Sequence, residues 1–207
     1  MSSAGILVAA SRFLVGGGAH WSGCRPTLRQ RIYFANHTSH MDTLVLWAAL
    51  PPVLRRSTRP VAAADYWGRG RLRRHMALDV LDSVLVNRGG SAGALGPVHD
   101  ALRDGASLIF FPEGTRGHGP LPDRFRTGLY YLAATHEDVE LVPVYLANLG
   151  RALPKGIRLP IPVSATVHFG APIRLGADEP REAFLDRARE AVAELGRRSL
   201  PELADGR

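Results

Sequence analysis

Short apolar runs alternate with segments of helical periodicity along most of the 207-residue chain, and this alternation constrains the fold more than any other feature. The clearest run, residues 107–111, carries no charge and is typical of a strand buried on both faces. Residues 31–35 predict another strand, and residues 43–50 predict a helix that ends at Pro51-Pro52. The alternation predicts an α/β fold, a single domain with a mixed, largely parallel central sheet flanked by helices.

The remaining elements follow from the same patterns. Further strands are predicted over residues 60–64, 80–86, 141–146 and 163–169, and helices over residues 66–78, 92–103, 125–135 and 180–198. The segment from Trp21 to Arg29 shows neither period and is expected to be an irregular lead-in. Pro143 has no backbone N–H, so it favours an edge strand or a bulge for its segment.

Residues 1–18 are predicted to form a segment of their own, ahead of a domain over residues 19–207. Apolar side chains recur at helical spacing in this segment, at Ile6, Leu7, Ala10, Phe13 and Leu14. The pattern predicts an amphipathic helix that either lies on a membrane surface or packs on the domain. No run reaches the ~18–20 apolar residues that a spanning helix needs. A signal peptide is not expected, because the segment lacks a basic start and a convincing cleavage site.

The chain is strongly basic, with a formal net charge of +7 and a pI near 10.4. This balance suits an anionic partner, such as lipid head groups, a phosphorylated cofactor, an acidic carrier protein or nucleic acid. Lys155 is the only lysine, so codon bias toward arginine in a GC-rich genome explains part of the excess. Cys24 is the only cysteine, which excludes an intrachain disulfide, and no C-x-x-C or H-E-x-x-H pattern predicts a metal site.

A polar heptad from Asn36 to Asp42 separates the strand at residues 31–35 from the helix that follows. His37 and Asp42 would lie roughly 140° apart on one continuous helix, so they can meet only if a helix begins between them. Ser39 is expected to be the N-cap, with Asp42 at the third helical position. A carboxylate on one imidazole nitrogen fixes the tautomer and leaves the other nitrogen free as a base. The alternative is a plain capping box with an incidental histidine.

Two more loops follow predicted strands and carry polar side chains. In an α/β sheet such loops gather at one edge, so the loops after residues 35, 86 and 111 are expected to form one site. Two arginines, a hydroxyl and glycine backbone in these loops suit a phosphate group. Alone, Arg88 is more typical of a solvated loop residue, and Glu113-Gly114 is more typical of an ordinary turn. The residues that the second and third loops contribute are Arg88, Glu113, Gly114, Thr115 and Arg116.

The order and spacing of these motifs resemble the signature blocks of the glycerolipid acyltransferases, the 1-acylglycerol-3-phosphate acyltransferase family. Asn87 departs from the family pattern, in which an acidic residue often precedes the arginine, and Gly117 stands where a serine often follows. Both departures bear on the acceptor head group more than on the reaction. The blocks are Asn36-His37 with Asp42 five residues after the histidine, Val84-Leu85-Val86-Asn87-Arg88, Phe111-Pro112-Glu113-Gly114-Thr115-Arg116 and Val142-Pro143-Val144.

The resemblance implies acyl transfer from a thioester, acyl-CoA or acyl-carrier protein, to the sn-2 hydroxyl of 1-acylglycerol 3-phosphate, which gives phosphatidic acid. His37 would be the general base and Asp42 would orient it, without a covalent acyl-enzyme, a metal or another cofactor. Glu113 is expected to brace an arginine or to contact a glycerol hydroxyl. The acceptor phosphate and head group would be held by Arg88, Glu113, Gly114, Thr115 and Arg116.

The implied partners are a lysophospholipid acceptor, the acyl donor and an anionic membrane surface. The protein would then sit at the cytoplasmic face of the cell membrane as a peripheral or monotopic protein. One alternative is the same chemistry on another acceptor, such as glycerol 3-phosphate or a different lysophospholipid. A second is a non-catalytic lipid-binding module, and a hydrolase acting on acyl esters is a weaker third. Nucleic-acid binding is not expected, because the aromatic residues are not interleaved with the arginines.

Overall fold

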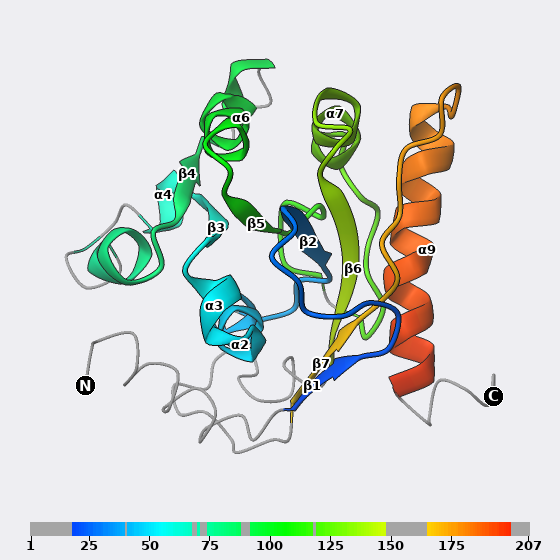
Figure 1. Ribbon diagram of the computed structural model, residues 1–207, viewed down its shortest axis with the longest axis horizontal. Helices are drawn as coiled ribbons and strands as arrows, with labels where there is room; N and C mark the ends of the chain where they lie inside the picture. Colours follow the sequence, from blue (N-terminus) through cyan, green and yellow to red (C-terminus); the bar gives the residue numbers. More distant parts are fainter. Residues whose placement is uncertain are drawn as a thin grey trace.

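The computed structural model describes residues 18–39, 41–67, 70, 74–87, 92–117, 119–147 and 165–199. Its centre is a seven-stranded sheet with the order β1-β7-β6-β2-β5-β3-β4 (Figure 1). The strands are β1 (Ala19–Trp21), β2 (Arg31–Ala35), β3 (Thr58–Ala63), β4 (Val84–Val86), β5 (Ser107–Phe110), β6 (Glu140–Ala147) and β7 (Thr166–Phe169). The helices are α2 (Asp42–Ala49), α3 (Pro52–Arg55), α4 (Ala64–Trp67), α6 (Gly96–Arg103), α7 (Gly128–Thr135) and α9 (Arg181–Ser199), with a π-helical turn at Met76–Val80 and a 3-10 turn at Ala92–Leu95.

The neighbouring strands from β6 to β4 all run parallel to one another. β7 is antiparallel to β6, and β1 pairs in parallel with β7 at the edge of the sheet. The sheet is therefore mixed and largely parallel, which confirms the predicted fold class. The central strand is β2, and its parallel neighbour β5 places Phe110 opposite Phe34, so both strands end at the same edge of the sheet.

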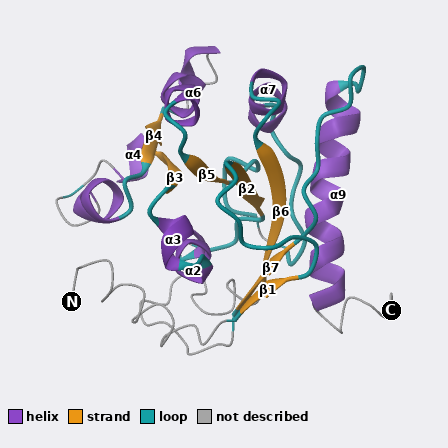
Figure 2. Ribbon diagram, in the orientation of Figure 1, coloured by secondary structure: helices purple, strands orange, loops and turns teal. Residues whose placement is uncertain are grey.

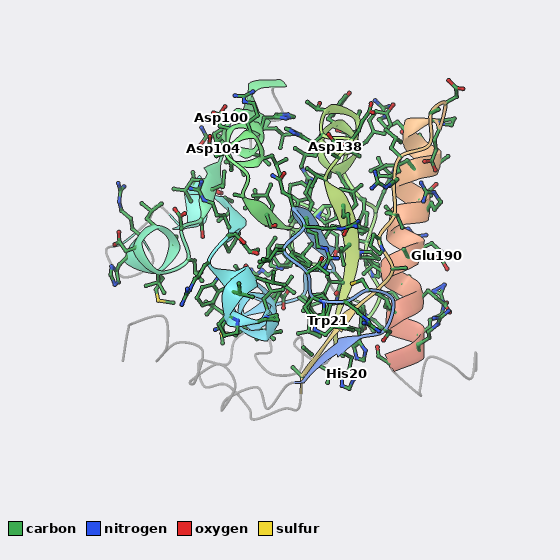
Figure 3. The ribbon with its side chains drawn as sticks, viewed as in Figure 1. His20, Trp21, Asp100, Asp104, Asp138 and Glu190 are labelled. Atoms are coloured by element: carbon green, nitrogen blue, oxygen red, sulfur yellow. The ribbon has the colours of Figure 1, made fainter. Side chains whose placement is uncertain are left out.

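Helices cover both faces of the sheet (Figure 2). The sequence of β2 explains this arrangement, because its alternate side chains point to opposite faces. Ile32 and Phe34 pack into a core with α6, α7 and α9, whereas Tyr33 and Ala35 pack into a second core with α2 and α3. The long helix α9 turns its apolar side toward the first core, and Glu190 projects away from the sheet (Figure 3).

The strand β6 is an inner strand, so the edge that Pro143 was predicted to mark is wrong. The predicted alternative, a bulge, is present beside Pro143, because Val144 pairs with Phe169 whereas Leu141 pairs with Ile173, one residue further along than an unbroken register allows. Pro143 lies opposite Phe34 of β2, and its carbonyl accepts a hydrogen bond from the Gly170 N–H at 2.9 Å on the other side. The position of the missing donor therefore faces β7 just beyond Phe169, its last ladder residue. Proline is tolerated in this inner strand because the bulge interrupts the regular ladder where its N–H is missing.

Other parts of the prediction also differ from the structure. The strand β1 was not predicted, because its three residues, Ala19–Trp21, are too few to show a period. In the region of the predicted helix over residues 66–78, α4 ends at Trp67 and a π-helical turn occupies Met76–Val80. The strand predicted over residues 80–86 starts only at Val84, because the π-helical turn takes up its first residue.

The predicted amphipathic helix falls almost wholly on residues 1–17, which lie outside the described residues, so it stays a prediction. None of the helices within the described ranges has the length and apolar character needed to span a membrane.

Candidate active site

The loops after β2 and β5 meet at the carboxyl edge of the sheet, as their strands predict. The His37 N–H donates a hydrogen bond to Glu113 Oε1 at 2.8 Å, and the Gly117 N–H donates to the His37 carbonyl at 2.7 Å. The loop after β5 thus holds both the backbone N–H and the backbone carbonyl of His37. Arg88 lies outside the described residues, so its place in the site stays a prediction.

The side chains of His37 and Asp42 are in direct contact, with 2.8 Å between Nδ1 and Oδ2. The same carboxylate oxygen accepts hydrogen bonds from the Thr38 N–H at 2.6 Å and the Ser39 N–H at 2.8 Å. Asp42 is fully buried, whereas the His37 side chain is 19% exposed. A carboxylate that accepts from Nδ1 keeps the proton there and leaves Nε2 as the basic nitrogen. The predicted contact between these two residues is therefore present.

The helix α2 begins at Asp42 itself, so the predicted N-cap role of Ser39 is wrong. Met41 precedes the helix with φ −81° and ψ −13°, and no side chain caps it. The hydroxyl of Ser39 accepts a hydrogen bond from the Met41 N–H at 3.2 Å instead. Asp42 therefore occupies the first helical position and not the third. From there its carboxylate accepts hydrogen bonds from N–H groups that precede the helix. In a capping box, the residue at the third helical position has this role.

Two further contacts fix the loop that carries His37, and sequence reasoning did not identify either of them. The ring of Phe111 stacks on the ring of His37, with 4.4 Å between their centroids. The buried amide of Asn36 donates to the Leu146 carbonyl at 3.2 Å and accepts from the Leu146 N–H at 2.8 Å. The position of Phe111 at the end of an apolar run was the available signal for the first contact. The loop is thus tied to both strands that flank β2.

The buried carboxyl of Glu113 joins three parts of the site. Its Oε1 accepts from the His37 N–H, and its Oε2 accepts from the Asp123 N–H at 3.2 Å. Burial raises the pKa of Glu113 to about 7, the two N–H donors oppose that rise, and the charge of nearby Asp123 adds to it. Among the described residues, the Glu113 side chain therefore hydrogen-bonds to backbone groups, and the expected contact with an arginine side chain is not found.

The position of Gly117 explains one departure from the family pattern. A Cβ atom added at Gly117 would lie 2.9 Å from Glu113 Oε2 and 2.9 Å from Asp123 Oδ2. Both atoms belong to carboxyl groups that face the glycine, so a serine at this position would force them apart. Glycine lets the loop close over Glu113 in this chain.

The raised pKa of Glu113 predicts that stability falls as pH rises. An unfolded chain ionises Glu113 near pH 4.5, whereas the folded protein holds the proton up to about pH 7, so the stabilisation is complete at low pH and is lost between these values. Between pH 5 and pH 8 this group alone should lower the free energy of unfolding by about 2 kcal/mol. Urea unfolding at both pH values should show a larger loss for the wild type than for Glu113→Gln. Equal losses in the two proteins would contradict the assignment.

The other predicted residues lie on the outer part of the loop after β5. Gly114 and Thr115 are exposed and Arg116 is half-buried. Gly114 has φ +69°, a conformation that favours glycine. Arg126, which the sequence patterns did not single out, lies across Gly114, and its Nε donates to the Glu113 carbonyl at 3.1 Å.

Comparisons with known proteins give relatives of one kind. A 1-acyl-sn-glycerol-3-phosphate acyltransferase from Chlamydomonas reinhardtii is 30% identical over 167 residues, which are 78% of this chain and 47% of that protein. A protein of the same name from Limnanthes douglasii is 28% identical over 156 residues, which are 73% of this chain and 53% of that protein. The chain thus spans about half the length of the curated relatives it matches.

A solved structure shares the fold. The crystal structure of the 1-acyl-sn-glycerophosphate acyltransferase PlsC from Thermotoga maritima aligns with a TM-score of 0.69 and 22% sequence identity, over 96% of this chain and 80% of that chain. The Acyltransferase family model matches residues 24–147, which include His37, Asp42, Glu113 and Arg116. This match covers more than half of the sequence, and the chain therefore belongs to the acyltransferase family.

Proposed function

We propose that the chain is a 1-acylglycerol-3-phosphate O-acyltransferase, which moves a fatty acyl group from an acyl thioester to the sn-2 hydroxyl of 1-acylglycerol 3-phosphate and gives phosphatidic acid. The observation that carries the proposal is the contact between His37 and the buried Asp42, with 2.8 Å between Nδ1 and Oδ2. A hydroxyl is a poor nucleophile until a base removes its proton, and this pair suits that step. The names of the relatives supply the acceptor.

In this mechanism Nε2 of His37 takes the proton of the sn-2 hydroxyl while the hydroxyl oxygen attacks the thioester carbonyl carbon. Asp42 stabilises the positive ring that results. The C–S bond of the tetrahedral adduct then breaks, and the leaving sulfur takes the proton from Nε2, which returns His37 to its starting form. A thiol with a pKa near ~8.5 leaves readily, so the acyl group passes directly to the acceptor without a covalent acyl-enzyme.

The acceptor phosphate binds at the loop after β5 in this proposal. Arg116 and Arg88 supply guanidinium groups, which form paired hydrogen bonds with phosphate oxygens. Thr115 adds a hydroxyl, and Gly114 lets the backbone approach the ligand closely. Glu113 acts through the backbone of His37, which its carboxyl group holds at 2.8 Å, and not through the substrate.

The acyl donor is acyl-CoA or acyl-carrier protein, and no further cofactor is needed. The net charge of +7 attracts phosphorylated or acidic donors and anionic lipid. We place the protein at the cytoplasmic face of the cell membrane as a peripheral or monotopic protein, because both the acceptor and the product carry long chains.

Residues 1–18 are proposed to hold the protein on the membrane through their apolar stripe. Deletion of these residues should release the protein from anionic liposomes in a co-sedimentation assay. The deletion variant should still transfer acyl groups to a short-chain, soluble acceptor, which controls for folding. Unchanged liposome binding would refute this role.

Three alternatives remain to be separated from the proposal. Another acceptor, such as glycerol 3-phosphate or a different lysophospholipid, needs the same chemistry, and acceptor competition separates it. A non-catalytic lipid-binding module is opposed by the contact of His37 with both Asp42 and Glu113. The run Gly89-Gly90-Ser91-Ala92-Gly93 fits the G-x-S-x-G spacing of serine hydrolases, so hydrolysis of the thioester is the third.

Thiol release from a long-chain acyl thioester tests the proposal. The assay uses acyl-CoA and acyl-carrier protein in turn, each with and without lysophosphatidic acid. Release that needs the acceptor, together with formation of phosphatidic acid, supports acyl transfer. Release without acceptor that is lost in Ser91→Ala would indicate a hydrolase. No release from either donor would leave the binding module.

A further inference from the structure

Arg126 is held against the loop after β5 by its backbone and its side chain. Its N–H donates to the Pro112 carbonyl at 2.8 Å, and its Nε donates to the Glu113 carbonyl at 3.1 Å. These bonds fix the position of Nε, where the guanidinium group begins, while the residue as a whole stays exposed. The side chain is thus exposed to solvent but fixed at its Nε.

The close approach of Arg126 to the loop depends on Gly114. A Cβ atom added at Gly114 would lie 2.7 Å from Arg126 Nε and 2.8 Å from Arg126 Cδ. At these separations the Arg126 side chain would have to shift, so glycine at this position lets the guanidinium group lie close to the loop. The same glycine has φ +69°, so the backbone conformation and the close packing both favour it.

The terminal nitrogens of Arg126 differ from those of two other arginines, Arg124 and Arg187, which are paired with carboxylates. Arg124 donates to Glu182 on α9 at 2.7 Å, and Arg187 forms paired bonds to Glu179. Within the described ranges, the two terminal nitrogens of Arg126 have no hydrogen-bond or ion-pair partner. A guanidinium group that is fixed at Nε and open at its other donors matches the fork geometry that binds a phosphate.

Glu113 links this guanidinium group to His37. Its carboxyl group accepts from the His37 N–H, and its carbonyl accepts from Arg126 Nε. One residue therefore sets the positions of the proposed base and of an arginine that carries no compensating carboxylate among the described residues. The next residues along the loop, Thr115 and Arg116, are the ones assigned to the acceptor phosphate above.

We infer that Arg126 is a further binding residue for the phosphate group of the acceptor, beside Arg116. This inference rests on the proposed function and adds a residue that the motif spacing does not include. It requires that the ligand carry a phosphate group, because a neutral glycerolipid offers no anionic oxygen to the open donors of Arg126.

Kinetics of Arg126→Gln test the inference, with Arg124→Gln as the matched control. Arg124 is exposed, lies two residues away and is paired with Glu182, so its loss removes the same charge without touching the loop. The KM for lysophosphatidic acid should rise roughly ten- to hundredfold in Arg126→Gln, as expected for a lost charged hydrogen-bonding group. The kcat and the KM for acyl-CoA should stay near wild type, and Arg124→Gln should show no change in either KM.

A binding titration separates failure of this inference from failure of the proposed function. His37→Ala protein, with and without Arg126→Gln, is titrated with a short-chain lysophosphatidate and with the matching monoacylglycerol. Loss of the preference for the phosphorylated ligand in the double variant supports the inference whether or not the wild type turns over. An unchanged preference, or a rise in the KM for the acyl donor alone, would overturn it.

Discussion

Replacement of His37 by alanine is expected to lower turnover by roughly 10²–10⁴, the contribution of a well-placed general base. The ring is 19% exposed, and the contacts that the substitution removes are the stack on Phe111 and the bond to Asp42, so the fold should survive the change. Steady-state rates of phosphatidic acid formation measure the effect. A thermal unfolding curve for the variant shows whether the protein is still folded.

The exposed pair of His75 and Asp79 supplies the control for this substitution. Its Nδ1 to Oδ2 distance is 2.6 Å, similar to that of His37 and Asp42, but the two side chains are 54% and 65% exposed. His75→Ala should therefore leave turnover unchanged. Equal losses in His75→Ala and His37→Ala, or wild-type turnover in His37→Ala, would contradict the role given to His37.

Replacement of Asp42 by alanine is expected to lower turnover on a similar scale and to destabilise the protein as well. A single oxygen of Asp42 accepts from the His37 ring, the Thr38 N–H and the Ser39 N–H. Its removal frees the ring to rotate and leaves the partly buried Thr38 N–H and the buried Ser39 N–H unpaired, at a cost of about 2 kcal/mol or more. Turnover and urea unfolding measured on the same preparation test both parts. Turnover that falls without any loss of stability would contradict this account of the three donors.

Asp42→Asn separates orientation from charge. The Thr38 and Ser39 N–H groups require an oxygen at the position of Oδ2, so the amide oxygen of the asparagine should also face His37 Nδ1. The ring keeps its tautomer but loses the negative charge that stabilises its protonated form. The amide nitrogen of the asparagine would take the place of Asp42 Oδ1, which is buried and has no hydrogen-bond partner among the described residues. Turnover should therefore fall less than in Asp42→Ala.

Much of the fold could be predicted because the buried strands have few alternatives. A five-residue run without charge, such as residues 107–111, is compatible with little except a buried strand. The order of the strands could not be predicted, because β2 lies between β5 and β6 through pairings that are distant in sequence. Pro143 indicated the bulge beside β6, but a local preference cannot distinguish a bulge in an inner strand from an edge strand.

The site, like the fold, contains local contacts that could be predicted from the sequence and distant contacts that could not. The contact of His37 with Asp42 could be predicted because both residues flank the start of one helix. The bond of His37 to Glu113 spans 76 residues, and that of Asn36 to Leu146 spans 110 residues, so neither could be derived from spacing. The same holds for Arg126, whose importance comes from its approach to Gly114 and not from a motif.

The most direct test of the mechanism is a single-turnover experiment on acyl-CoA without acceptor, followed by addition of lysophosphatidic acid. Direct transfer by His37 predicts no thiol burst and no change in the mass of the protein before the acceptor is added. Thiol and phosphatidic acid should then appear together in equal amounts. A burst of one thiol per protein, with an acyl group added to the protein mass, would show a covalent intermediate and contradict the account.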